Sequence, residues 1–209
     1  RIDHIVGLFR IWAIPPKSSA KRGSFKPHDE SLWVEHGKKI LEQFLSATTM
    51  LPIAEDLGVV PNEVRSCLTS MGICGTKVLR WERHWEGDRS FINADAYPPL
   101  SMSCVSTHDS DTLRQWWSTS DASRFAQQHG IHYQDKLDSA THKKLLRLSH
   151  STKSLFHINL LSEYFHLVEG LAWDNPDDER VNTPASVSNK NWSIRFRTSS
   201  NIWTKDEAL

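Results

Sequence analysis

Short apolar runs alternate along the chain with longer segments in which apolar residues recur at helical spacing. Residues 32–45 show the helical pattern, because Trp33, Leu41 and Leu45 recur at helical spacing while charged residues occupy other positions. Further helices are predicted from about 61 to 71 and over 111–117, 121–129 and 137–149, and strands over 51–54, near 78–79, and over 102–106 and 154–161. This alternation predicts a parallel sheet with its functional groups on the loops that follow the strands.

Two stretches break the alternation. Residues 17–31 are polar, contain Gly23 and Pro27, and follow two consecutive prolines, so we expect an exposed loop there. From about residue 174 the chain is polar again, with prolines and clusters of Asn and Ser, and we expect an irregular segment.

Three acidic residues stand at comparable places in this pattern. Asp3, Glu55 and Asp109 each follow the carboxyl end of a short predicted strand. In a (β/α)₈ barrel all such ends meet at one face, where active sites are built. A barrel unit averages about 30 residues. The gap from Asp3 to Glu55 therefore fits one unit enlarged by the loop 17–31, and the gap from Glu55 to Asp109 fits two units. The spacing therefore predicts part of a TIM barrel.

Composition excludes several classes of function. Lys+Arg and Asp+Glu both number 25, so no net charge attracts nucleic acid or an anionic membrane. The three cysteines lack metal-ligand spacing and are expected to be reduced thiols in a cytoplasmic protein. Histidines and acids lie scattered over different predicted strands, so no metal site is predicted. The sequence begins without Met and inside a predicted functional strand, and we expect it to be the C-terminal part of a longer protein.

The acids have the residue types that cleavage of a glycosidic bond with retention requires. Such cleavage uses two carboxyl groups about 5 Å apart, one attacking the anomeric carbon and one exchanging a proton with the leaving or incoming oxygen. Arg1 would favour the ionised form of Asp3, whereas the adjacent charge of Asp56 and burial would favour protonated Glu55. Asp109 would bind sugar hydroxyls and stabilise an oxocarbenium-like transition state.

Simpler interpretations remain for the same residues. Arg1 and Asp3 alone are also what a structural ion pair at a strand end looks like. His4 and His108 can donate hydrogen bonds to a sugar, and each by itself could equally be a hydrogen-bonded structural histidine.

Four sequence motifs together resemble one family. The order and spread of the motifs, from residue 1 to about 197, match the 4-α-glucanotransferases, also called amylomaltases or disproportionating enzymes, which are relatives of the α-amylases. The motifs are Arg1-Ile2-Asp3-His4, Ala54-Glu55-Asp56-Leu57-Gly58, Ser106-Thr107-His108-Asp109 with Asp111-Thr112-Leu113, and Arg180-Val181-Asn182-Thr183-Pro184 with Asn191-Trp192. Residues 185–190 depart from the family, in which a glycine-richer turn is usual.

The resemblance implies a role for each matching residue and no required cofactor. Asp3 would be the nucleophile, Glu55 the acid/base and Asp109 the transition-state stabiliser. Substrate contacts would come from the neighbours of these acids and from the last motif, namely Arg1, His4, Asp56, His108, Asn182 and Trp192.

The expected fold is α/β, the C-terminal part of a (β/α)₈ TIM barrel from about strand 4 to strand 8, with the N-terminal part of the barrel absent. Residues 1–209 would form one partial catalytic domain, with helical insertions around 110–150 and an irregular segment from about 174. The expected activity is transfer of α-1,4-glucan segments from a maltooligosaccharide or α-glucan donor to an acceptor sugar, without nucleic-acid or membrane partners. The alternatives are a hydrolase of the same superfamily and an inactive glucan-binding fragment.

Overall fold

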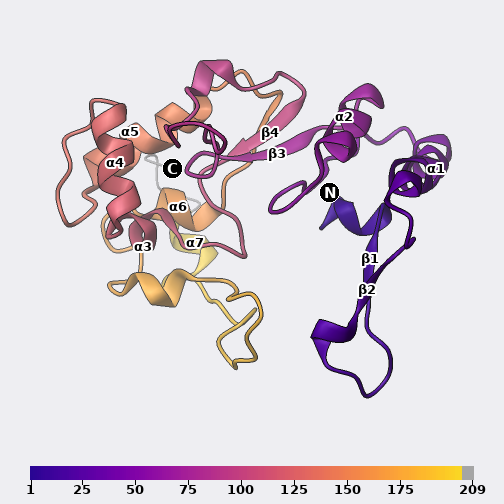
Figure 1. Cartoon of the computed structure of the whole chain (residues 1–209). Helices are drawn as coiled ribbons and strands as arrows, with labels where there is room; N and C mark the ends of the chain where they lie inside the picture. The colour runs from indigo at the N-terminus through magenta and orange to yellow at the C-terminus, as the bar shows by residue number, and fades with distance from the viewer. Residues whose placement is uncertain (204–209) are drawn as a thin grey trace. The chain divides into compact units, whose positions relative to one another are not determined.

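The computed structural model describes residues 1–203, and contacts divide the chain into two units (Figure 1). Unit 1 contains Arg1–Thr76 and Leu100–Met102, and unit 2 contains Lys77–Pro99 and the chain from Ser103 onward. The division falls within strands β3 (Gly75–Val78) and β4 (Ser101–Cys104).

Unit 1 is built around two helices, α1 (Trp33–Ala47) and α2 (Asn62–Ser70). Both were predicted from helical spacing, and both predictions are confirmed. Gly72 follows α2 with φ +73°, a conformation in which glycine carries no Cβ penalty. The core of the unit joins apolar residues of both helices to the short 3₁₀ helix Ile5–Leu8 and includes Ile5, Phe9, Trp33, Leu41, Ala54, Val64, Leu68 and Ile73.

The polar loop predicted over 17–31 is in part a strand. β1 (Ile11–Ala13) pairs antiparallel with β2 (Ser24–Lys26), and 3₁₀ helices at Ala20–Arg22 and Glu30–Leu32 lie on either side of β2. The apolar contact that fixes this hairpin comes from Phe25, whose ring lies 4.9 Å from Trp12 and 5.3 Å from Trp33 between ring centroids. A three-residue strand with one apolar residue gives too short a pattern to be read as a strand.

The strands on which the predicted site depends are short. The run predicted over 51–54 forms only isolated parallel bridges, from Ala54 to Ile2 and from Ile53 to Cys74. β3, β4 and β5 (Phe156–His157) form a three-stranded sheet in the order β3-β4-β5, and the strand predicted over 154–161 is thereby reduced to two residues. Neighbours in the sheet follow one another in the chain, as they do in an α/β barrel.

Unit 2 is largely helical. Its helices are α3 (Leu113–Trp117), α4 (Ser120–Gln128), α5 (Ser139–His150), α6 (Leu161–Phe165) and α7 (Ser200–Trp203), with 3₁₀ turns at Ala94–Ala96 and Pro176–Glu179. The core packs Val105, Leu113, Trp117, Phe125 and Leu145. The predicted helices over 111–117, 121–129 and 137–149 are confirmed, with ends shifted by one to two residues.

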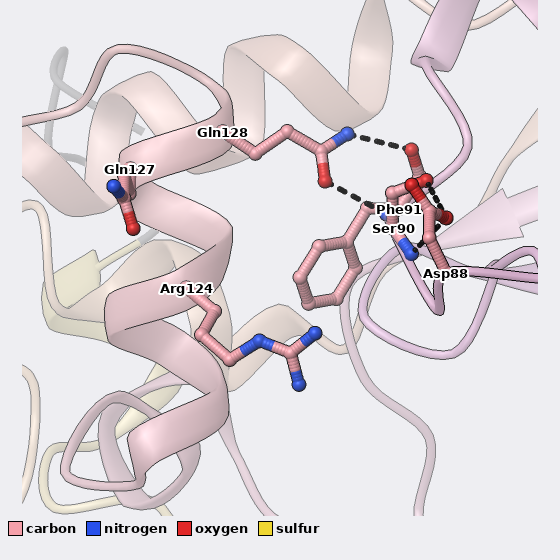
Figure 2. Close-up of a pocket in the computed structure, with 6 residues that line it drawn as sticks. All are labelled: Asp88, Ser90, Phe91, Arg124, Gln127 and Gln128. Atoms are coloured by element: carbon pink, nitrogen blue, oxygen red, sulfur yellow. Dashed lines mark hydrogen bonds between the residues drawn. The ribbon is translucent and has the colours of Figure 1, made fainter.

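The loop that contains Phe91 is hydrogen-bonded to Gln128 of α4 in unit 2. Gln128 accepts a hydrogen bond from the backbone N–H of Phe91 (2.8 Å) and donates one to its carbonyl (2.6 Å), as Figure 2 shows. The pocket beside this contact is lined mainly by polar side chains, including the exposed Asp88 and Arg124, together with the buried ring of Phe91. Across residues 1–203, no helix combines the length and the apolar character needed to cross a membrane.

Candidate active site

The first predicted acid, Asp3, is paired as expected with Arg1. The guanidinium Nη2 lies 2.8 Å from the carboxylate Oδ1, and the Asp3 side chain is 68% exposed. The predicted strand is reduced here to one isolated parallel bridge, between Ile2 and Ala54. Arg1 and Asp3 flank Ile2 and so lie on the same side of this bridge.

Glu55 is joined by backbone bonds to the residues on both sides of Asp3. Its N–H donates to the carbonyl of Ile2 (2.9 Å), and its carboxylate Oε2 accepts the N–H of His4 (2.7 Å). His4 has φ 44°, in the left-handed region that non-glycine residues seldom adopt. Oε1 of Glu55 accepts a further N–H from Leu57 (3.2 Å). Asp3 and Glu55 therefore lie on hydrogen-bonded neighbouring segments of unit 1.

Asp56, predicted as a substrate contact, points into the protein. It is 5% exposed, and its two oxygens accept hydrogen bonds from the Arg65 guanidinium (3.1 Å) and the Thr76 N–H (2.7 Å). A Cβ added at Gly75 would lie 3.0 Å from Asp56 Oδ2, so the carboxylate packs directly on that backbone. Side chains of consecutive extended residues point to opposite faces, which directs Asp56 away from the side that Glu55 occupies.

Asp109, in unit 2, is held by residues far along the chain. Its Oδ1 accepts a hydrogen bond from Asn182 Nδ2 (2.7 Å), and its Oδ2 lies 3.5 Å from His108 Nε2. The Asn182 N–H also donates to the His108 carbonyl (3.0 Å), so backbone and side chain both fix the pair. The ring of Trp192 lies 5.2 Å from that of His108, and Trp192 is 64% exposed. Four predicted site residues of unit 2 thus form one cluster.

A cavity of about 400 Å³ in unit 2 adjoins Asp109 and is lined by two arginines, Arg80 and Arg180, that were not among the predicted site residues. Arg180 forms an ion pair with Asp111, and Arg80 donates to the Ser110 hydroxyl (2.7 Å) and to the Asp111 carbonyl. Burial lowers the pKa of the Arg80 guanidinium, and Asp111 opposes that effect. Arg80 follows β3 as the acids follow their strands, so the positional rule used for acids would have found it.

No group of histidines, cysteines and acids with metal-binding geometry is present among the described residues. The three cysteines, Cys67, Cys74 and Cys104, are buried. Burial raises the pKa of the Cys67 and Cys74 thiols, which disfavours the reactive thiolate.

Comparison with known proteins gives consistent matches. Residues 1–200 match the family described as 4-alpha-glucanotransferase. Over 201 residues the chain is 46% identical to the 4-alpha-glucanotransferase of Chlamydia pneumoniae and 45% identical to that of Chlamydia muridarum. Each match covers 95% of this chain but 38% of the relative, so the chain spans well under half the length of these relatives.

Solved structures agree at the level of the fold. The amylomaltase of Streptococcus agalactiae, in complex with acarbose, matches with a TM-score of 0.67 and 22% identity over 95% of this chain and 37% of that one. The amylomaltase of Corynebacterium glutamicum matches with a TM-score of 0.68 and 19% identity over 99% of this chain and 34% of that one. The fold is therefore a TIM-barrel-related α/β fold.

Proposed function

Because the chain belongs to the 4-alpha-glucanotransferase family, we propose that it carries the catalytic acids of an enzyme that transfers α-1,4-glucan segments. The donor is a maltooligosaccharide or α-glucan, the acceptor is another sugar, and no cofactor takes part. The observation that carries this proposal is that Asp3 lies in the chain between Ile2 and His4, which both hydrogen-bond to Glu55; this supports a pair of neighbouring carboxyl groups.

In the first step Asp3 attacks the anomeric carbon of the donor, and the glycosidic C–O bond breaks. Glu55 gives its proton to the departing oxygen, and the glucan remains joined to Asp3 as an ester. The ion pair with Arg1 supports this role because it holds the Asp3 carboxylate in one orientation.

In the second step a hydroxyl of the acceptor sugar attacks the same carbon from the side the leaving group left. Glu55 takes the hydroxyl proton, the ester to Asp3 breaks, and a new α-linkage forms with the original configuration. The two backbone N–H groups that bind Glu55 support its role, because they fix both oxygens relative to Asp3.

Asp109 stabilises the positive charge that develops at the sugar ring in both steps. Its hydrogen bond from Asn182 orients one carboxylate oxygen and leaves the group 41% exposed to a ligand. Trp192 offers a flat apolar ring beside His108, and such a ring suits the apolar face of a sugar. Arg1, His4, His108 and Asn182 complete the substrate contacts. Asp56 contributes by holding the backbone next to Glu55, since its own oxygens are already hydrogen-bonded.

We further propose that residues 1–209 correspond to about strands 4 to 8 of the barrel, with the segment 110–150 as helical insertions. The parallel bridges at Ile2, Ile53 and Ala54, followed by the order β3-β4-β5, support this assignment. On this assignment we expect the isolated 209-residue chain to be unstable or inactive. The free, buried thiols of Cys67 and Cys74 favour a cytoplasmic location.

Hydrolysis by the same acids is the second candidate, because the 68% exposure of Asp3 leaves its ester open to water. Maltotriose as sole substrate separates the two activities. Transfer yields glucose and a ladder of longer products, whereas hydrolysis yields only shorter ones.

The decisive experiment replaces the nucleophile in the intact protein. Asp3→Asn should lower kcat by at least about 10³-fold, since loss of a covalent nucleophile removes the whole pathway. The matched control is Asp95→Asn, which makes the same change at an exposed aspartate and should leave kcat unchanged. Full activity in folded Asp3→Asn would overturn the proposal.

A further inference from the structure

Glu163, on α6, is a buried acid that the proposed chemistry does not use. It is 2% exposed, and its contacts come from three different elements. Oε1 accepts hydrogen bonds from the Ser106 hydroxyl (2.5 Å) and the Leu113 N–H (3.0 Å), and Oε2 lies 3.4 Å from Nε2 of His142 on α5. Acids are seldom buried to this extent unless they are paired, so the arrangement calls for a specific reason.

The two donors to Oε1 stand at the two ends of one loop. Ser106 precedes residues 107–112, and Leu113 follows them as the first residue of α3. A single carboxylate oxygen therefore closes the loop that carries His108 and Asp109. The Leu113 N–H belongs to the first turn of α3, where the helix dipole also favours a negative charge.

A second buried charge holds the middle of the same loop. Arg80, 3% exposed, donates to the Ser110 hydroxyl and the Asp111 carbonyl, and the Ser110 hydroxyl in turn accepts the Thr107 N–H (2.9 Å). The residues from 106 to 113 are thus fixed at both ends by a carboxylate and at the centre by a guanidinium.

Stability alone does not account for a buried acid at this position. The cost of removing a buried ion pair from water offsets much of its attraction, and apolar residues of the same volume often stabilise a fold as well. Burial by itself would raise the pKa of Glu163, but the adjacent His142, the Ser106 hydroxyl and the Leu113 N–H bring that pKa below its usual value. The loop is therefore arranged around the Glu163 carboxylate.

We propose that Glu163 is a positioning residue for Asp109: its carboxylate sets the path of residues 107–112 and so the direction in which the Asp109 carboxylate faces the sugar. The inference rests on the proposed role of Asp109. It adds that this role depends on a side chain that never touches substrate.

The test uses Glu163→Gln in the intact protein, because glutamine keeps the size and one acceptor oxygen but removes the charge. A displaced catalytic group affects the transition state more than substrate binding, so kcat should fall by about tenfold or more while KM changes by less than about threefold. Ser106→Ala, which removes only the hydroxyl bond to Oε1, should lower kcat in the same manner and replaces Glu163→Gln if that variant does not fold.

The matched control is Thr152→Val, which removes a buried hydroxyl of unit 2 that bonds to Ser103 (2.9 Å) and does not contact residues 106–113. It should lower thermal stability and leave kcat unchanged. If Thr152→Val lowers kcat as much as Glu163→Gln does, the effect is one of general stability and the inference is wrong.

A double variant separates the inference from the proposed function. In the background of Asp109→Asn, Glu163→Gln should cause no further loss of kcat, because the group it positions is already gone. An equal further loss would overturn the positioning role, as would a Glu163→Gln enzyme within twofold of the unaltered kcat. If Asp109→Asn is itself fully active, the proposed function of Asp109 fails instead.

Discussion

The contact between Asn182 and Asp109 gives the sharpest test of how the unit 2 cluster works. Asn182 Nδ2 donates to Asp109 Oδ1 at 2.7 Å. Asn182→Asp replaces this donor by a carboxylate oxygen of almost the same size. The substitution therefore turns an attraction into a repulsion without changing the packing.

The expected loss follows from the distance and the exposure. Two unit charges 2.7 Å apart repel by about 1.5 kcal/mol in a water-like medium, which suits a carboxylate that is 41% exposed. The lost hydrogen bond to a charged group adds about 1.5 kcal/mol, the lower end of its range, because water can replace the amide. Together these contributions raise the barrier by about 3 kcal/mol, or roughly 150-fold in kcat.

The assay is glucose release from maltotriose by the intact protein, with kcat and KM measured separately. Asn182→Leu, which removes the donor but adds no charge, should lower kcat only about tenfold. The control is Asn175→Asp, which adds the same charge at a helix cap where aspartate serves as well as asparagine. If Asn182→Asp stays within threefold of the unaltered enzyme while Asp109→Asn is inactive, the hydrogen bond does not position the stabilising carboxylate.

Three further predictions concern stability. Asp56→Asn breaks the ion pair with Arg65 and should lower the free energy of unfolding of the protein in urea by about 2 kcal/mol, because Arg65 is partly exposed; an unchanged midpoint would contradict the buried role of Asp56. Gly37→Ala should destabilise by about 1 to 2 kcal/mol in the same assay, since the new Cβ would lie 2.3 Å from the Phe9 ring and the strain exceeds the gain in helix propensity; higher stability would refute that packing. Burial lowers the pKa of His129 from 6.5, so the unfolded chain binds the proton more readily than the folded chain does. The free energy of unfolding should therefore fall as the pH drops below about 6.5. His129→Phe should make that fall shallower, and an unaltered dependence on pH would contradict the prediction.

The helices of this chain could be predicted from sequence, and so could β3 and β4, which overlap the strands predicted near 78–79 and over 102–106; the other strands largely could not. α1 and α2 extend over enough turns for a 3.6-residue period to be visible. The run 51–54 and β5 form only one or two backbone pairs each, and so short an apolar run carries no period. β2 was missed because it has a single apolar residue, Phe25, whose packing against Trp12 and Trp33 is visible only in the structure.

Site residues could be predicted only where the sequence alone marks their position. Asp3, Glu55 and Asp109 were found because each follows the end of a short predicted strand. The inward direction of Asp56 follows from strand alternation and could have been derived. Glu163 gave no signal, because a glutamate in a short helical segment reads as a solvent-facing residue until Ser106 and His142 are placed against it.

The two halves of the proposed chemistry are positioned by different kinds of bond. Asp3 and Glu55 are placed by bonds whose donors are main-chain N–H groups, from Glu55 to the Ile2 carbonyl and from His4 to the Glu55 carboxylate, so substitutions around them that keep the backbone should leave the spacing of the pair intact. Asp109 is placed by side chains, since Asn182 holds its carboxylate and Glu163 holds its loop. Because a side chain can be altered without unfolding the backbone, conservative changes in unit 2 should shift kcat at nearly constant stability, whereas changes near Asp3 and Glu55 should act on folding and activity together.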